Sequence, residues 1–96
     1  MKQIDSEKLV ERTLVEGVKK AGGMCIKLLS QHMLGLPDRL CLFPGGRLCF
    51  VELKTTGQKP KKIQAYMHDK LRLLGFQVFV LDSVKEVKEL CNDYAN

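Results

Sequence analysis

The sequence predicts an α/β domain in which one mixed β-sheet is flanked by helices. Helical and strand periodicities alternate in the order α-β-β-β-α-β-α, a tight turn joins the second and third strands, and a helix links the third and fourth. A hairpin followed by a strand–helix–strand crossover places antiparallel and parallel pairs in one sheet. The chain has 96 residues, so we expect a single domain, 1–96, with an extra helix at its C-terminal end.

Apolar residues at helical spacing predict a first helix that starts after Asp5 or Ser6 and ends at Gly22-Gly23. Its apolar stripe consists of Val10, Leu14, Val18 and Ala21. Residues 24–29 are predicted to form a mostly buried strand, and residues 30–36 lack a clear period, which is typical of a loop.

A hairpin follows, in which strands 39–43 and 47–51 flank the turn signal Pro44-Gly45-Gly46. If all three turn residues form the loop, Phe43 pairs with Arg47, and counting outward brings Asp38 opposite Glu52. A two-residue loop would instead place Asp38 opposite Leu53.

The second half predicts a helix, a strand and a final helix. Pro60 suits the first turn of a helix whose apolar stripe is Ile63, Met67, Leu71 and Leu74. Residues 76–81 are nearly all apolar and β-prone, which indicates an interior strand. Ser83 and Glu86 form a capping box at the start of the last helix, with Val84, Val87, Leu90 and Cys91 facing inward.

Composition excludes several classes of protein. Apolar residues make up 45% and charged residues 28%, which is a globular balance. No apolar run approaches the roughly 18 to 20 residues of a membrane span, and no signal pattern follows Met1. The four cysteines have neither zinc spacing nor secretory context, so we expect reduced thiols and a cytoplasmic protein.

Positive charge is concentrated in one block. The net charge is +5, and residues 54–72 contain six lysines and arginines against one aspartate. Such a block suits a polyanionic partner, although a basic surface stretch is often only solvated.

Three charged positions break the apolar patterning. Glu11 lies about 20° from Val18 around the first helix, so it falls on the buried stripe. Alternatively, it forms an ion pair at the edge of this stripe. Glu7 lies on the same face, nearer the end of the helix, where it can reach water. Asp38 directly precedes a strand, where it could simply be a turn residue. Glu52 and Lys54 share one strand face, where they could simply form an ion pair.

Taken together, these positions indicate metal-assisted hydrolysis. Opposed carboxylates on Asp38 and Glu52 repel each other unless a divalent cation lies between them. Mg²⁺ or Mn²⁺ there, with Glu11 as a further ligand, could activate water, while Lys54 stabilises charge on a phosphoryl group.

Three parts of the sequence resemble a known family: residues 35–39 (GLPDR), residues 50–54 (FVELK) and Gln64 on the next predicted helix. In combination they resemble the virus-type replication-repair nuclease (VRR-NUC) family of the PD-(D/E)XK nuclease superfamily. The resemblance implies a restriction-endonuclease-like αβββαβ core over nearly the whole chain.

The resemblance also implies roles for individual residues. Glu11, Asp38 and Glu52 would be acidic metal ligands, together with the backbone carbonyl of Leu53, and the ion would be Mg²⁺ or Mn²⁺. Lys54 would be the catalytic lysine and Gln64 the helix glutamine near the site. DNA contacts are expected from Lys59, Lys61, Lys62 and Arg39, while His32 and His68 are expected to be bystanders.

The implied activity is structure-specific DNA cleavage, including resolution of four-way (Holliday) junctions in DNA repair, by a homodimeric enzyme encoded by a bacterium or phage. Two alternatives remain open. One is a restriction-like or RNA-cleaving nuclease of the same superfamily, and the other is a nucleic-acid-binding module without catalysis.

Overall fold

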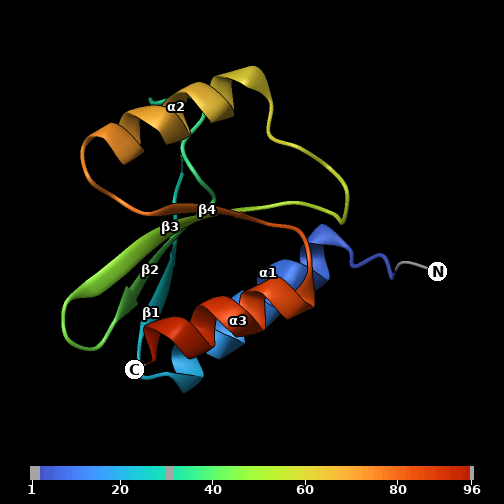
Figure 1. Ribbon diagram of the computed structural model, residues 1–96, viewed down its shortest axis with the longest axis vertical. Helices are drawn as coiled ribbons and strands as arrows, with labels where there is room; N and C mark the ends of the chain where they lie inside the picture. The colour runs from blue at the N-terminus through green and yellow to red at the C-terminus, as the bar shows by residue number, and fades with distance from the viewer. Residues whose placement is uncertain (1–2, 30–31, 96) are drawn as a thin grey trace.

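The computed structural model describes residues 3–29 and 32–95, which form three helices and a four-stranded sheet (Figure 1). In chain order these are α1 (Glu7–Lys20), β1 (Met24–Lys27), β2 (Arg39–Phe43), β3 (Arg47–Leu53), α2 (Lys62–Leu73), β4 (Val78–Leu81) and α3 (Val84–Tyr94). The predicted α/β class and order of elements are confirmed. Within the described part of the chain, no helix is long and apolar enough to cross a membrane.

The sheet has the strand order β1-β2-β3-β4, with antiparallel pairing among the first three strands and β4 parallel to β3. The predicted mixed sheet is therefore confirmed. The interior position expected for the fourth strand is wrong. Among the described residues, β4 is an edge strand whose one neighbour in the sheet is β3. The expectation of a mostly buried first strand is also wrong: β1 is the opposite edge, and Met24 is 63% exposed.

The β2–β3 hairpin has the register of a three-residue turn. Phe43 pairs with Arg47 and Arg39 with Val51, so the next positions outward are Asp38 and Glu52. Gly45 and Gly46 have φ values of 85° and 75°, a region that glycine adopts without steric penalty. The turn thus brings the two predicted carboxylates to neighbouring strand ends.

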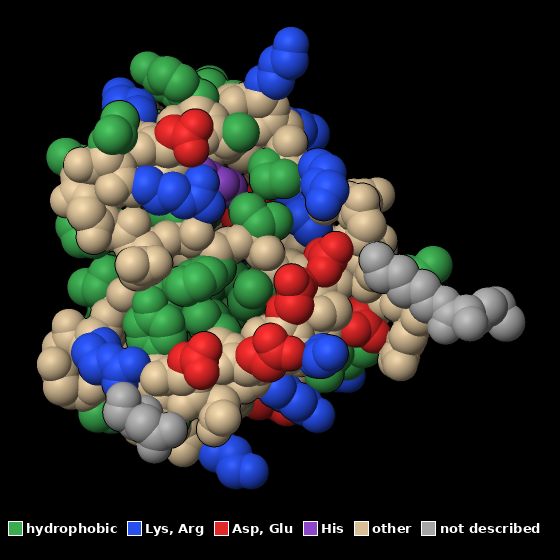
Figure 2. Space-filling model, in the orientation of Figure 1, with side chains coloured by type: hydrophobic (Ala, Val, Ile, Leu, Met, Phe, Trp, Pro, Cys, Tyr) green, Lys and Arg blue, Asp and Glu red, His purple; other side chains and the backbone are tan. Residues whose placement is uncertain are grey.

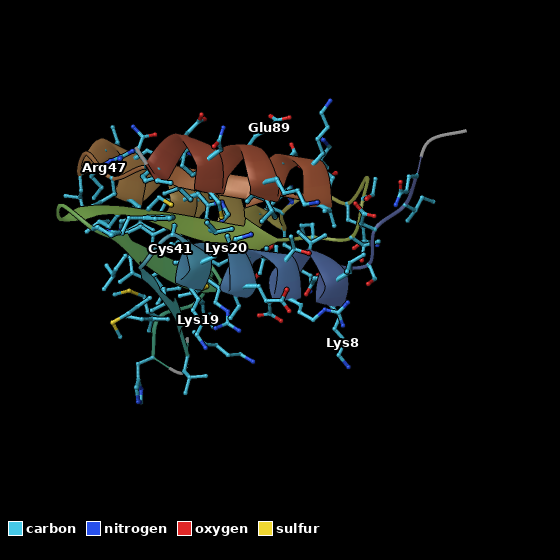
Figure 3. The ribbon with its side chains drawn as sticks, turned by 90° about the horizontal axis from the view of Figure 1, so that it is seen from below. Lys8, Lys19, Lys20, Cys41, Arg47 and Glu89 are labelled. Atoms are coloured by element: carbon cyan, nitrogen blue, oxygen red, sulfur yellow. The ribbon has the colours of Figure 1, made fainter. Side chains whose placement is uncertain are left out.

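Helices α1 and α3 cover one face of the sheet, and α2 lies on the other side (Figure 1). The core consists of the α1 stripe, inward residues of α3 and alternate residues of the strands: Val10, Leu14, Val18, Cys41, Phe43, Cys49, Val51, Leu53, Leu81, Val87 and Leu90. In Figure 3, Cys41 lies within the molecule, whereas Lys8 and Glu89 point outward from α1 and α3. All four cysteines are free, as expected.

The N-terminal caps of α1 and α3 are the serines that the sequence predicts. Ser6 caps α1 by accepting a hydrogen bond from the Leu9 amide, and Ser83 caps α3 by accepting one from the Glu86 amide. The expected capping box is only half formed, since the Glu86 carboxylate accepts from the amide of Asp82 instead. Pro60 precedes the α2 cap, Lys61, and therefore lies outside the first turn.

The predicted apolar stripe of α2 is only partly its inward face: Met67 and Leu71 are half-buried, whereas the two ends of the stripe are exposed. Ile63 is 46% exposed and Leu74, the C-cap, is 74% exposed. The buried residue of this helix is His68. The prediction is wrong at the ends of the stripe, because the most buried position of α2 is polar and meets a charged group of the sheet instead of the apolar core.

Candidate active site

Glu52 is the centre of the candidate site. It lies near the end of β3 and is only 1% exposed. Its neighbours Val51 and Leu53 point into the core beneath α1, so strand alternation directs Glu52 towards α2. A carboxylate buried in this way needs compensating polar contacts.

Lys54 and Gln64 supply such contacts to one oxygen of Glu52. The Gln64 Nε2 group donates a 2.9 Å hydrogen bond to Glu52 Oε2, and Lys54 Nζ lies 3.5 Å from the same oxygen. Lys54 Nζ also donates to Gln64 Oε1 at 3.1 Å. The glutamine oxygen further accepts from the backbone amide of Lys61, which ties the start of α2 to the end of β3.

Asp38 lies beside this cluster. Its Oδ2 accepts a 2.8 Å hydrogen bond from the backbone amide of Leu53, which fixes the carboxylate at the end of β3. Burial, and next the negative charge of Asp38, raise the pKa of Glu52 from 4.5 to about 7, against the opposing effect of Lys54. The charge of Glu7 raises the pKa of Glu52 further.

The carboxylate pair fits a divalent cation. Among the residues that the structure describes, Glu52 Oε1 has no hydrogen-bond partner although it is buried, and burial together with the charge of Asp38 raises the pKa of Glu52. Hard cations such as Mg²⁺ prefer carboxylate oxygens and can bind through one or two of them, with water or substrate phosphate completing the shell. Among residues 3–29 and 32–95, no group of three or more Asp, Glu, His or Cys side chains is arranged to hold a metal ion.

Glu11 is not part of this arrangement. Its carboxylate lies 3.1 Å from Arg39 Nη2 and is 31% exposed, which is the edge ion pair that the sequence left open. Alternation in β2 places Arg39 on the α1 side of the sheet, whereas Glu52 faces α2. The helix glutamate whose charge acts on Glu52 is Glu7, and its backbone amide donates to Thr55 Oγ1 just after β3.

Arg39, a predicted DNA contact, makes its contacts within the protein in this structure. Its side chain is 15% exposed, pairs with Glu11 and donates to the backbone carbonyl of Cys25. The guanidinium thus contacts α1 and β1 of the protein itself. By contrast Lys59, Lys61 and Lys62, hereafter the basic segment, are all exposed at the entrance to α2. In Figure 2, basic side chains lie around α2 with an acidic one among them, whereas acidic and basic side chains are mixed over α3.

His68 was expected to be a bystander, but the structure places it beside Glu52. The side chain is 1% exposed, and its Nε2 lies 3.8 Å from Glu52 Oε1. The sequence did contain a signal, because His68 is four residues after Gln64 and therefore on the same side of the helix. His32 is exposed.

The order of elements, the aspartate before β2 and the Glu-x-Lys at the end of β3 define a domain of the PD-(D/E)XK nuclease class. No family model matches the chain. A solved structure described as "VRR_NUC domain" matches with a TM-score of 0.84 and 33% identity, covering 94% of this chain and 99% of that one. "Putative nuclease p44" of Acyrthosiphon pisum secondary endosymbiont phage 1 is 46% identical over 77 residues, 80% of this chain and 83% of that protein. The chain belongs to the VRR-NUC family.

Proposed function

We propose that this protein is a metal-dependent endonuclease that hydrolyses phosphodiester bonds in branched DNA, with the four-way junction as its substrate. The observation that carries the proposal is the buried cluster of Glu52, Lys54 and Gln64 beside Asp38 at the end of β3. Membership of the VRR-NUC family and the similarity to a phage protein named as a nuclease support it.

Asp38, Glu52 and the backbone carbonyl of Leu53, the residue after Glu52, would hold Mg²⁺ or Mn²⁺. When bound, such an ion stabilises the negative charge that develops on the phosphate during hydrolysis. We assign the metal-binding glutamate of α1 to Glu7 in preference to Glu11, because Glu11 pairs with Arg39 whereas the charge of Glu7 acts on Glu52.

Lys54 is the residue that we expect to act on the reacting phosphate. Its side chain is 12% exposed, and Gln64 orients its ammonium group. A fixed positive charge in a largely buried position stabilises a developing oxyanion without reorganising during the reaction. Gln64 bonds to both Lys54 and Glu52, so it would keep the charge-stabilising group and the metal ligand in fixed relation.

The basic segment would contact DNA phosphates. Phosphate contacts position a duplex without reading its sequence, which suits an enzyme that recognises DNA structure. Resolution of a four-way junction requires cuts in two strands related by two-fold symmetry. A C2 homodimer supplies two such sites, and it is the commonest form of oligomer.

The test is cleavage of a labelled four-way junction beside linear duplex DNA and single-stranded RNA, with Mg²⁺ and with EDTA. The Glu52→Gln variant is the matched control, since it removes the charge while keeping the shape. Selective, Mg²⁺-dependent cleavage of the junction supports the proposal. Preferential cleavage of linear DNA or RNA would favour the other nuclease classes, and binding without cleavage would indicate a non-catalytic module.

A further inference from the structure

Two buried polar atoms face each other beside the candidate metal site. Glu52 Oε1 and His68 Nε2 are the buried side-chain nitrogen and oxygen atoms without a hydrogen-bond partner among the residues that the structure describes. They are 3.8 Å apart, which is longer than a hydrogen bond. Buried polar groups are nearly always paired, so two unpaired atoms in mutual contact call for an explanation.

The position of His68 on α2 supplies one. Gln64 and His68 are four residues apart, so they project from the same side of the helix towards the same carboxylate. Gln64 already donates to Oε2 of Glu52, and His68 faces Oε1. If His68 Nε2 came about 1 Å closer to Glu52 Oε1, each oxygen of this carboxylate would accept a hydrogen bond from a side chain of α2. An ionised carboxylate accepts about four hydrogen bonds or metal contacts, so these two donors leave room for a cation.

Apolar packing does not account for this histidine. His68 lies outside the apolar core, which is built on the α1 and α3 side of the sheet. The apolar residues of α2 are exposed, as Ile63 and Leu73 are, or only half-buried, as Met67 and Leu71 are. The helix therefore buries a hydrogen-bonding side chain at the point where it meets Glu52.

We propose that His68 is a positioning residue, which donates its Nε2–H to Glu52 Oε1 and sets the orientation of this carboxylate for the metal ion. The inference rests on the proposed function, because it concerns Glu52 as a metal ligand. His68 acts through Glu52 and touches neither the ion nor the DNA. Partners of this kind typically change metal affinity by 10- to 100-fold when they are removed.

The experiment measures Mn²⁺ binding without DNA, from the paramagnetic resonance signal of the free ion. His68→Leu removes the donor at similar volume, and we expect it to weaken Mn²⁺ binding by about 10-fold or more. His68→Gln retains an N–H donor and should keep most of the native affinity. His32→Leu, a change at the exposed histidine, is the matched control and should bind like the native protein.

The outcomes separate this inference from the proposed function. Equal Mn²⁺ affinity of native protein and His68→Leu would overturn the positioning role while leaving the nuclease proposal intact. A native protein that binds no Mn²⁺ and cleaves no nucleic acid would overturn both. If His68→Leu does not fold, nitrogen-15 spectra of the native imidazole decide the matter, since a ring protonated on Nδ1 and bare on Nε2 would refute the proposal.

Discussion

The buried carboxylate of Glu52 should destabilise the metal-free protein at high pH. Burial and the neighbouring Asp38 raise its pKa from 4.5 to about 7, so the folded state disfavours the ionised form more than the unfolded state does. The stability associated with protonated Glu52 is therefore fully present below about pH 4.5 and is lost as the pH rises through about 7. Glu52→Gln should remove this loss because the amide cannot ionise.

The magnitude follows from the two pKa values. One pKa unit corresponds to about 1.4 kcal/mol, so the ionised carboxylate costs about 3 kcal/mol of folding free energy at pH 8 and about 1 kcal/mol at pH 5. The Glu52→Gln variant should consequently gain stability over the native protein mainly at the higher pH. With a urea m-value of about 1–3 kcal/mol per molar, the unfolding midpoint at pH 8 should rise by at least about 1 M.

The assay is urea unfolding at both pH values in the presence of EDTA, repeated with Mg²⁺. At pH 8, Mg²⁺ should reduce the difference in unfolding midpoint between the Glu52→Gln variant and the native protein. The ion should stabilise the native protein alone, since a ligand that binds only the folded state adds to its stability. Without Mg²⁺, an equal difference in stability between the variant and the native protein at pH 5 and pH 8 would refute the reasoning. A native protein more stable than the variant at pH 8 would also refute it.

Three further predictions concern the reaction and the substrate. Lys54→Ala should lower the single-turnover cleavage rate by about 10²–10³ while junction binding in gel shifts persists; a change of only a few-fold would assign Lys54 to the ion pair alone. Glu7→Gln should impair Mg²⁺-dependent cleavage more than Glu11→Gln, the reverse of the order that the apolar stripe predicts; an inactive, folded Glu11→Gln would restore the first assignment. Alanine at all three lysines of the basic segment should flatten the salt dependence of junction binding by up to about 0.9 per lost phosphate contact, and an unchanged slope would place the DNA elsewhere.

Much of the fold depends on local features that the sequence displays directly. Ser6 and Ser83 can cap helices because their hydroxyls reach nearby backbone amides, and this requires no distant partner. Gly45 and Gly46 adopt positive φ values, so the turn and the pairing of β2 with β3 follow from neighbouring residues. The proximity of Asp38 to Glu52 is a consequence of that register.

Other features depend on what each surface meets after folding. Periodicity shows that residues share a side of a helix, but it does not show whether that side faces apolar core or polar groups. This is why Ile63 and Leu74, at the ends of the apolar stripe of α2, are exposed, and why His68 was overlooked although it lies four residues from Gln64.

The same limit explains the two glutamates of α1. The sequence by itself determined that Glu7 and Glu11 lie along one side of the helix, because both positions follow from its 3.6-residue period. Only the tertiary structure decided their partners: Arg39 reaches Glu11 from the α1 side of the sheet, while Glu7, beside the segment after β3, acts on Glu52. Both glutamates lie on α1, so the difference arises from what each turn of the helix meets. Glu7 lies where the helix begins, beside Thr55, and Glu11 lies one turn further along, beside Arg39; these neighbours exist only once the helix packs against the sheet.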